Sequence, residues 1–180
     1  MYKMGDLVVY EGSSSICEIS RIDRFDFQGG DRDRLYYVLK PLREDCVIYN
    51  PVDNTSARMR PVLTRDEAER LIDTIPDLAP AEPQAEGHPA QEAKQMAQHF
   101  ESIIRTRDCA RLLELTMSLY DKQRRQAACA RAISPTEAAA KKRAEEMLFD
   151  ELSIALGIPA EGVQKYIEAR LDGKTGKVLQ

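Results

Sequence analysis

The chain has 180 residues, no tryptophan, two histidines and four cysteines. The cysteines, Cys17, Cys46, Cys109 and Cys129, lie far apart and form no C-x-x-C pair. This spacing argues against a zinc site and favours free thiols, as in a reducing cytosol. We therefore expect no metal, no other cofactor and a cytoplasmic location.

Long apolar runs are also missing. No stretch of about 18 apolar residues occurs, which is the length that a membrane helix needs. The first residues, MYKMGDLVVYEG, lack the apolar core and the cleavage site of a signal peptide. The sequence therefore predicts no membrane span and no membrane partner.

Common catalytic motifs are absent as well. The sequence contains no G-x-x-x-x-G-K-[ST], G-x-G-x-x-G, H-E-x-x-H or G-x-S-x-G motif. The serines at 13–15 have no histidine near them in the sequence, because His88 and His99 fall in or near a proline-rich segment. A nucleophilic serine needs a positioned base. We expect a protein that is not an enzyme and has no small-molecule substrate.

The first 63 residues carry the pattern of short β-strands. Four runs are rich in β-branched and aromatic residues, and polar turns separate them. They are Leu7–Tyr10, Ile16–Ile22, Tyr36–Leu39 and Val47–Tyr49. This pattern predicts a small, bent β-sheet or open barrel of the Tudor-like kind, with an edge that can take up another chain.

The rest of the chain carries helical patterns. A capping box at Thr64–Glu67 starts a short helix, which we expect to close a first domain at residues 1–76. Proline, alanine and acidic residues at 77–91 predict a linker. Residues 92–180 predict a helical bundle, with a second capping box at Ser134–Glu137, a left-handed cap at Gly157 and a leucine stripe beside Tyr120. The predicted fold class is therefore α+β: a β-rich domain followed by an all-α bundle.

Basic residues gather in the helical part. The formal net charge of the whole chain is −4, yet residues 105–143 contain ten basic and four acidic residues. The cluster Lys141–Arg143 lies in the first turns of a predicted helix, where the helix dipole disfavours cations. An anionic partner is one explanation, and a solvated helical face is the other. Because no base-reading motif occurs, a DNA contact would involve the backbone and the groove shape.

Several sequence blocks occur in the order seen in a known family. In the first half they are Gly5-Asp6, Val8-Val9-Tyr10, Tyr36–Lys40, Pro51-Val52-Asp53 and Arg60-Pro61-Val62. In the second half they are Arg107-Asp108, Ser134-x-x-Glu137 and Glu151-Leu152. Over about residues 1–157 the chain resembles the CarD/CdnL family of bacterial transcription regulators. The N-terminal module of that family is shared with the polymerase-interacting domain of the transcription-repair coupling factor.

The resemblance implies two partners. The β-rich domain would bind the β subunit of RNA polymerase, and the helical domain would stabilise the open promoter complex by contacting DNA at the upstream edge of the bubble. The resemblance assigns polymerase binding to Val47, Tyr49 and Asn50. It leaves the basic side chains of the helical domain as candidates for DNA binding: Arg105, Arg107, Lys141, Lys142 and Arg143.

One departure from the family keeps a second hypothesis open. Family members often carry a tryptophan wedge near the start of the helical domain, where this chain has about Ala93. Phe100 and Met96 are the candidate replacements, and a place in the core is the alternative for Phe100. Without a wedge, the helical domain could bind another protein instead of DNA. The chain would then be a polymerase-binding adaptor.

Overall fold

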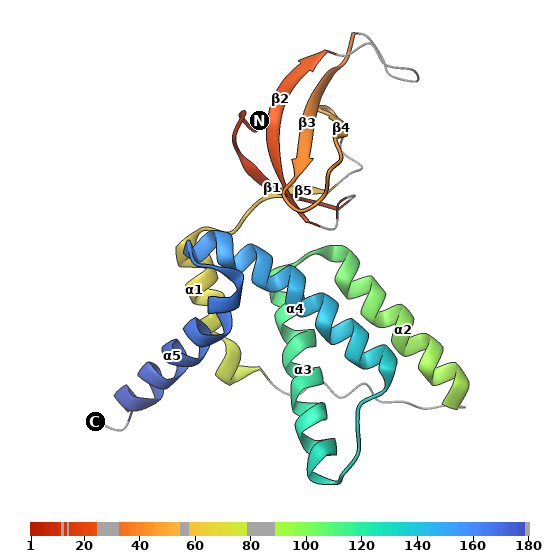
Figure 1. Cartoon of the computed structure of the whole chain (residues 1–180), viewed down its shortest axis with the longest axis vertical. Helices are drawn as coiled ribbons and strands as arrows, with labels where there is room; N and C mark the ends of the chain where they lie inside the picture. Colours follow the sequence, from red (N-terminus) through yellow and green to blue (C-terminus); the bar gives the residue numbers. More distant parts are fainter. Residues whose placement is uncertain (12, 14, 25–32, 55–57, 79–88, 179–180) are drawn as a thin grey trace. The chain divides into compact units, whose positions relative to one another are not determined.

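The computed structural model describes residues 1–11, 13, 15–24, 33–54, 58–78 and 89–178, with the backbone alone at 89, 90, 92 and 173–178. The chain divides into two compact units, Met1–Val62 and Leu63–Gln180, which are drawn in Figure 1 and are treated separately below. The described part contains a five-stranded antiparallel sheet followed by five α-helices. The predicted α+β class is thus confirmed.

The first unit is an open sheet of five strands. Three of the four predicted runs fall within strands, the fourth overlaps β4 from Ile48 onward, and a short fifth strand follows them. The strands are β1 (Leu7–Tyr10), β2 (Ile16–Arg24), β3 (Leu35–Pro41), β4 (Ile48–Pro51) and β5 (Met59–Pro61). Their order is β4-β3-β2-β1-β5, so β4 and β5 are the edges and no barrel closure is seen among the described strands. The turn residues Gln28–Asp31, where we expected a tight hairpin, lie outside the described residues.

Tyr2 connects two strands of the sheet through hydrogen bonds. Its backbone N–H donates to Tyr37 Oη on β3 at 3.2 Å, and its own Oη donates to the Met59 carbonyl on β5 at 3.1 Å. Strands β3 and β5 are three positions apart in the sheet, which is about 14 Å along a flat surface. Tyr2, together with the side chain of Tyr37, therefore links these two strands across the face of the sheet. The core that Tyr2 covers consists of Val8, Cys17, Ile19, Tyr37 and Leu39.

The second unit consists of helices. They are α1 (Arg65–Asp73), the 3-10 turn η1 (Ile75–Asp77), α2 (Pro89–Thr106), α3 (Cys109–Ala128), α4 (Pro135–Leu156) and α5 (Ala160–Val178). Both predicted capping boxes are present, and Gly157 ends α4 with φ 67°, so these sequence predictions are confirmed. Within the described ranges, no helix has both the length and the apolar character that crossing a membrane requires.

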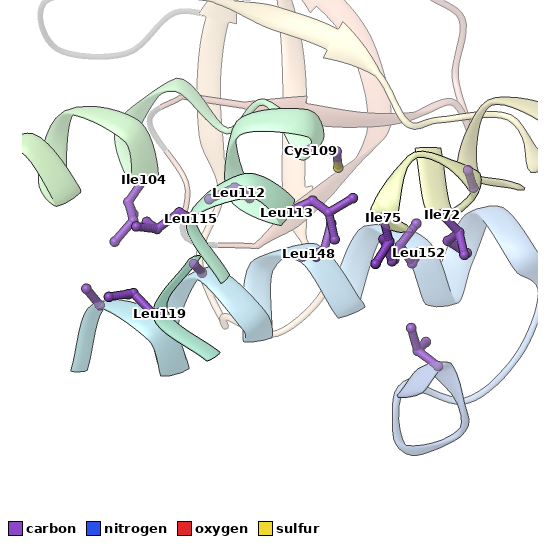
Figure 2. Packing of buried hydrophobic residues seen from close by; sticks show 14 of the residues in the cluster. Ile72, Ile75, Ile104, Cys109, Leu112, Leu113, Leu115, Leu119, Leu148 and Leu152 are labelled. Atoms are coloured by element: carbon purple, nitrogen blue, oxygen red, sulfur yellow. The ribbon is translucent and has the colours of Figure 1, made fainter. Parts of the chain in front are cut away.

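Helix α4 lies at the centre of the helical unit. It packs against α1, α2, α3 and α5. Buried residues recur every fourth position along it, which places them in one stripe: Ala140, Ala144, Leu148, Leu152 and Leu156. Figure 2 shows Leu112 and Leu113 of α3 beside Leu148, and Ile72 and Ile75 beside Leu152.

Helix α1 belongs to the helical unit, which corrects the predicted domain boundary. Ala68, Ile72 and Ile75 share one hydrophobic core with α3 and α4, whereas the sheet has a core of its own. On α5, Arg170 Nε and Nη2 donate to the Asp73 carboxylate at 2.7 and 3.0 Å. The boundary therefore falls after residue 62 and not at 76. The predicted linker 77–91 lies inside the second unit, and its residues 79–88 lie outside the described part.

We predict that Ile72→Ala destabilises the helical unit and not the sheet. Ile72 is fully buried, so removing three carbons should cost about 2–5 kcal/mol. Hydrogen exchange measured in low concentrations of urea should show a loss of amide protection in α4 and α5, with the protection of the strands unchanged. Arg70→Ala, at an exposed site of the same helix, is the control. Loss of amide protection in the strands alone would show that α1 is part of the first unit.

Candidate interaction surfaces

Strand β4 alternates between the core of the sheet and its surface. Ile48 packs against the sheet core, as does Val52 just beyond the strand. Val47, which precedes the strand, and Tyr49 have the opposite parity, and 51% and 44% of their surfaces are exposed. Two large apolar side chains thus stand next to each other on one face of this strand.

The third polymerase candidate of this strand points inward. Asn50 is 3% exposed, and its Oδ1 accepts a hydrogen bond of 2.9 Å from Nδ2 of Asn54. This bond holds the turn that follows β4. Asn50 therefore positions the strand, while Val47 and Tyr49 are the candidates that are exposed.

Strand β4 is at the edge of the sheet. It pairs with β3, and no other strand of the described part pairs with its outer side. Pro51 fits this place, because proline has no N–H and is confined to edge strands within sheets. Exposed Leu42, in the segment between β3 and β4, adds a further apolar side chain to this end of the sheet. We call β4 with Val47 and Tyr49 the edge surface.

The candidates at the junction of α2 and α3 differ in exposure. Arg105 is exposed in the last turn of α2, where a cation complements the helix dipole. Arg107 is 8% exposed and has a φ of 51°, because the chain reverses here between the two helices. Asp108 then caps α3 by accepting from the backbone N–H groups of Ala110 and Arg111. Arg105 can meet a large anionic partner as it stands, whereas Arg107 is part of the turn.

The three cations at 141–143 do not form one surface. Successive residues of a helix point about 100° apart. Arg143 Nη1 donates to the carboxylate of Glu101 on α2 at 2.9 and 3.2 Å, and Lys142 lies 3.9 Å from Glu146. Lys141 points to α3. The cluster that appears continuous in the sequence is therefore divided between two neighbouring helices and the surface of α4.

A surface that the sequence analysis did not single out lies where α3 and α4 pack together, about two helical turns before the loop that joins them. Tyr120, Gln123 and Arg124 share one face of α3 through their i, i+3, i+4 spacing. Lys141 of α4 places Nζ 5.3 Å from the centre of the Tyr120 ring and donates to Gln123 Oε1 at 3.1 Å. We call Tyr120, Gln123, Arg124 and Lys141 the hairpin tip. The sequence signal was Arg124 four residues after Tyr120. The sequence analysis placed Tyr120 beside a leucine stripe and counted Arg124 among the basic residues, without joining the two.

The structure places the candidate wedge Phe100 in the core. Phe100 is 5% exposed and belongs to the same cluster as Ile104 and Leu148. A wedge side chain has to reach its partner from the surface, so the fold gives Phe100 a packing role. Met96 is half-buried against the same core.

A partly buried ion pair joins α3 and α4 next to the hairpin tip, on the side of the loop. Lys122 Nζ of α3 donates to Glu137 Oε1 of α4, and the Ser134 N–H donates to Glu137 Oε2 at 2.8 Å. Burial by itself raises the pKa of Glu137, but the hydrogen bonds from Lys122 and from Ser134 outweigh it and lower the pKa below the ordinary value of 4.5. The charged carboxylate therefore ties the start of α4 to the end of α3.

No protein-family model and no curated protein matches the chain. The resemblance to the CarD/CdnL family thus stays a hypothesis based on the sequence blocks. Among the described residues, no three His, Cys, Asp or Glu side chains lie where they could hold a metal ion together.

We predict that Glu137→Gln lowers stability at pH 7 by about 1–3 kcal/mol, the cost of removing hydrogen bonds to a charged group. The folded carboxyl has a lowered pKa, so its stabilisation is present above pH 4.5 and is lost as the pH falls through the folded pKa. Urea unfolding at a series of pH values should therefore show the difference between variant and wild type shrinking toward acid. Glu114→Gln, at an exposed site of α3, is the control. A difference that does not vary with pH would contradict the charged pair.

Proposed function

We propose that the chain is a non-enzymatic bacterial transcription regulator with two binding surfaces. The edge surface binds the β subunit of RNA polymerase. The cations of the helical unit contact promoter DNA near the upstream edge of the bubble and stabilise the open complex. This function brings together the family resemblance of the sequence and the two exposed surfaces of the structure.

The observation that carries the proposal is the edge surface. An edge strand offers backbone groups to a strand of another protein, and alternate side chains then give specificity. Val47 and Tyr49 supply apolar contacts at that edge. Tyrosine is among the residues that dominate binding energy at protein interfaces. We include in the proposal that the bent, open sheet is a relative of the Tudor-like polymerase-interacting module.

The DNA contact is supported by individual exposed cations of the helical unit and not by its net charge, because residues 63–180 contain 17 basic and 20 acidic residues. Arg105 is exposed. Lys141 contacts a neutral amide and an aromatic ring, and neither of these groups neutralises its charge. Lys142 is exposed and lies at 3.9 Å from its acidic neighbour, a weak surface pair. These side chains can bind phosphates without breaking a strong internal ion pair. Arg143 would first have to leave Glu101.

We predict that Tyr49→Ala weakens binding to the polymerase β subunit by about 10- to 100-fold, because it removes an exposed aromatic anchor. The measurement is a titration of the labelled full-length chain with the purified β subunit. Tyr120→Ala is the matched control, since Tyr120 is exposed to a similar degree but lies in the helical unit. Binding of Tyr49→Ala at wild-type strength would overturn the proposed polymerase contact.

The second candidate function is a polymerase-binding adaptor whose helical unit binds another protein. It is favoured by the core position of Phe100, which leaves the helical unit without the wedge expected from the family.

Salt dependence separates the two functions. If three phosphates are neutralised, affinity for a bubble template should fall roughly 40-fold between about 50 and 200 mM salt. Fluorescence titration of the wild-type chain measures this. Arg105→Gln should reduce the slope, and Lys165→Gln, at an exposed site of α5, should not. Template binding that is absent or independent of salt would favour the adaptor.

A further inference from the structure

The hairpin tip has a combination of groups that charge alone does not explain. Tyr120 is 49% exposed and is the one exposed large hydrophobic side chain among the described residues of the helical unit. It stands next to Lys141, whose ammonium lies over its ring. An exposed aromatic ring beside cations offers a face for stacking and charges for an anion, so it fits a ligand that is both flat and anionic.

The cations of the hairpin tip can be used by a ligand. No described residue forms an ion pair with Arg124. Lys141 contacts the neutral groups of Gln123 and Tyr120. The nearest buried acid, Glu137, is paired with Lys122. One acidic neighbour on α4, Glu145, follows Lys141 by one turn. Asp121 of α3 is a second acid near the ring, and no ion pair of the described part holds Arg124 or Lys141. Both cations of the tip are therefore available to a ligand.

We propose that the hairpin tip binds single-stranded nucleic acid, with the ring of Tyr120 stacked on an unpaired base and with Arg124 and Lys141 on the adjacent phosphates. Stacking on an aromatic side chain combined with cations along the backbone is how sequence-tolerant single-strand binding works. The bases of a duplex are already stacked on both faces, so a duplex can use the cations but not the ring. This inference deepens the DNA contact of the proposed function and rests on that function for the source of the strand, the opened promoter.

The ring also distinguishes a nucleic acid from an acidic protein. An acidic peptide would bind Arg124 and Lys141 through charge, and it would contact position 120 through any apolar side chain of similar size. A base needs an aromatic face. The substitution Tyr120→Leu keeps apolar area and a good helix former, and it removes the face.

The test is fluorescence anisotropy of the full-length protein with a labelled single strand of about 12 nucleotides and with a duplex of the same length. Tyr120→Ala and Tyr120→Leu should each weaken single-strand binding by about 5- to 100-fold and leave duplex binding within about twofold. Tyr120→Phe should bind like wild type. Arg124→Gln should weaken the binding of both the single strand and the duplex. It should also lower the salt dependence of binding by an amount equal to about one phosphate contact.

The controls distinguish a failure of the inference from loss of folding and from a failure of the proposed polymerase contact. Position 120 is half-exposed, and circular dichroism should show that Tyr120→Ala stays folded. Lys165→Gln changes an exposed cation of α5 and should bind both ligands like wild type. Polymerase binding, measured with the same variants, reports on the edge surface, so a failure of the polymerase contact appears there and not in the oligonucleotide titration.

Four results would overturn the inference. They are no binding of the single strand by the wild type, wild-type affinity in Tyr120→Ala, an equal loss for single strand and duplex, and full affinity in Tyr120→Leu. Binding of a poly-glutamate peptide as tightly as the single strand, with the same dependence on Tyr120, would assign the tip to an acidic protein instead. A loss of single-strand binding that is specific to the aromatic ring supports the inference.

Discussion

The helical unit depends on the burial of one face of α4. This helix packs against the four other α-helices of the unit, and its apolar stripe from Ala140 to Leu156 supplies the surface that they share. Because every other helix loses part of its buried area if α4 moves, the burial of this stripe makes the unit cooperative. Cavities along it are costly, since neighbouring side chains cannot collapse into the space.

Two buried carboxylates set the position of α4 along its axis. Near its start, Glu137 binds Lys122 at the end of α3. Toward its end, Glu151 accepts hydrogen bonds from the Leu63 N–H at 3.0 Å and from Cys109 Sγ at 2.9 Å. A stripe of aliphatic side chains tolerates sliding, whereas a buried charge must meet its own donors. The same ion pair that fixes α4 on α3 therefore also fixes Lys141 over Tyr120, and the shape of the hairpin tip follows from the core.

Periodicity predicted the elements well, and the limits of the prediction are visible in particular residues. The capping boxes and the cap at Gly157 are local features, so spacing alone revealed them. The packing partner of α1 depends on residues far away in the sequence. The apolar stripe of α1 could pack against any core, and only the contacts of Ile72 and Arg170 show that this core is helical.

The candidate site residues were harder to predict for the same reason. A count of cations does not tell which of them already forms an ion pair. Arg143, for example, pairs with Glu101, which is 42 residues away in the sequence. It also does not tell that Arg107 is buried in a turn, or that Lys141 reaches an aromatic ring on another helix. Pairing across helices decides which charges are available to a partner, and that information appears only with the fold.

The two surfaces have a physical reason to be in one chain under the proposed function. A small basic surface with one aromatic ring binds nucleic acid weakly at cellular salt concentrations, because counterions compete for the phosphates. Once the edge surface is bound to polymerase, the hairpin tip meets the opened promoter at the effective concentration set by the tether, which reaches the millimolar range for short connections. A weak DNA contact is then sufficient to bias the open complex, and it dissociates when the polymerase leaves the promoter. A strong DNA contact would instead hold the protein on DNA elsewhere, so a small basic surface on a helical unit that is not basic as a whole is the property that such a regulator needs.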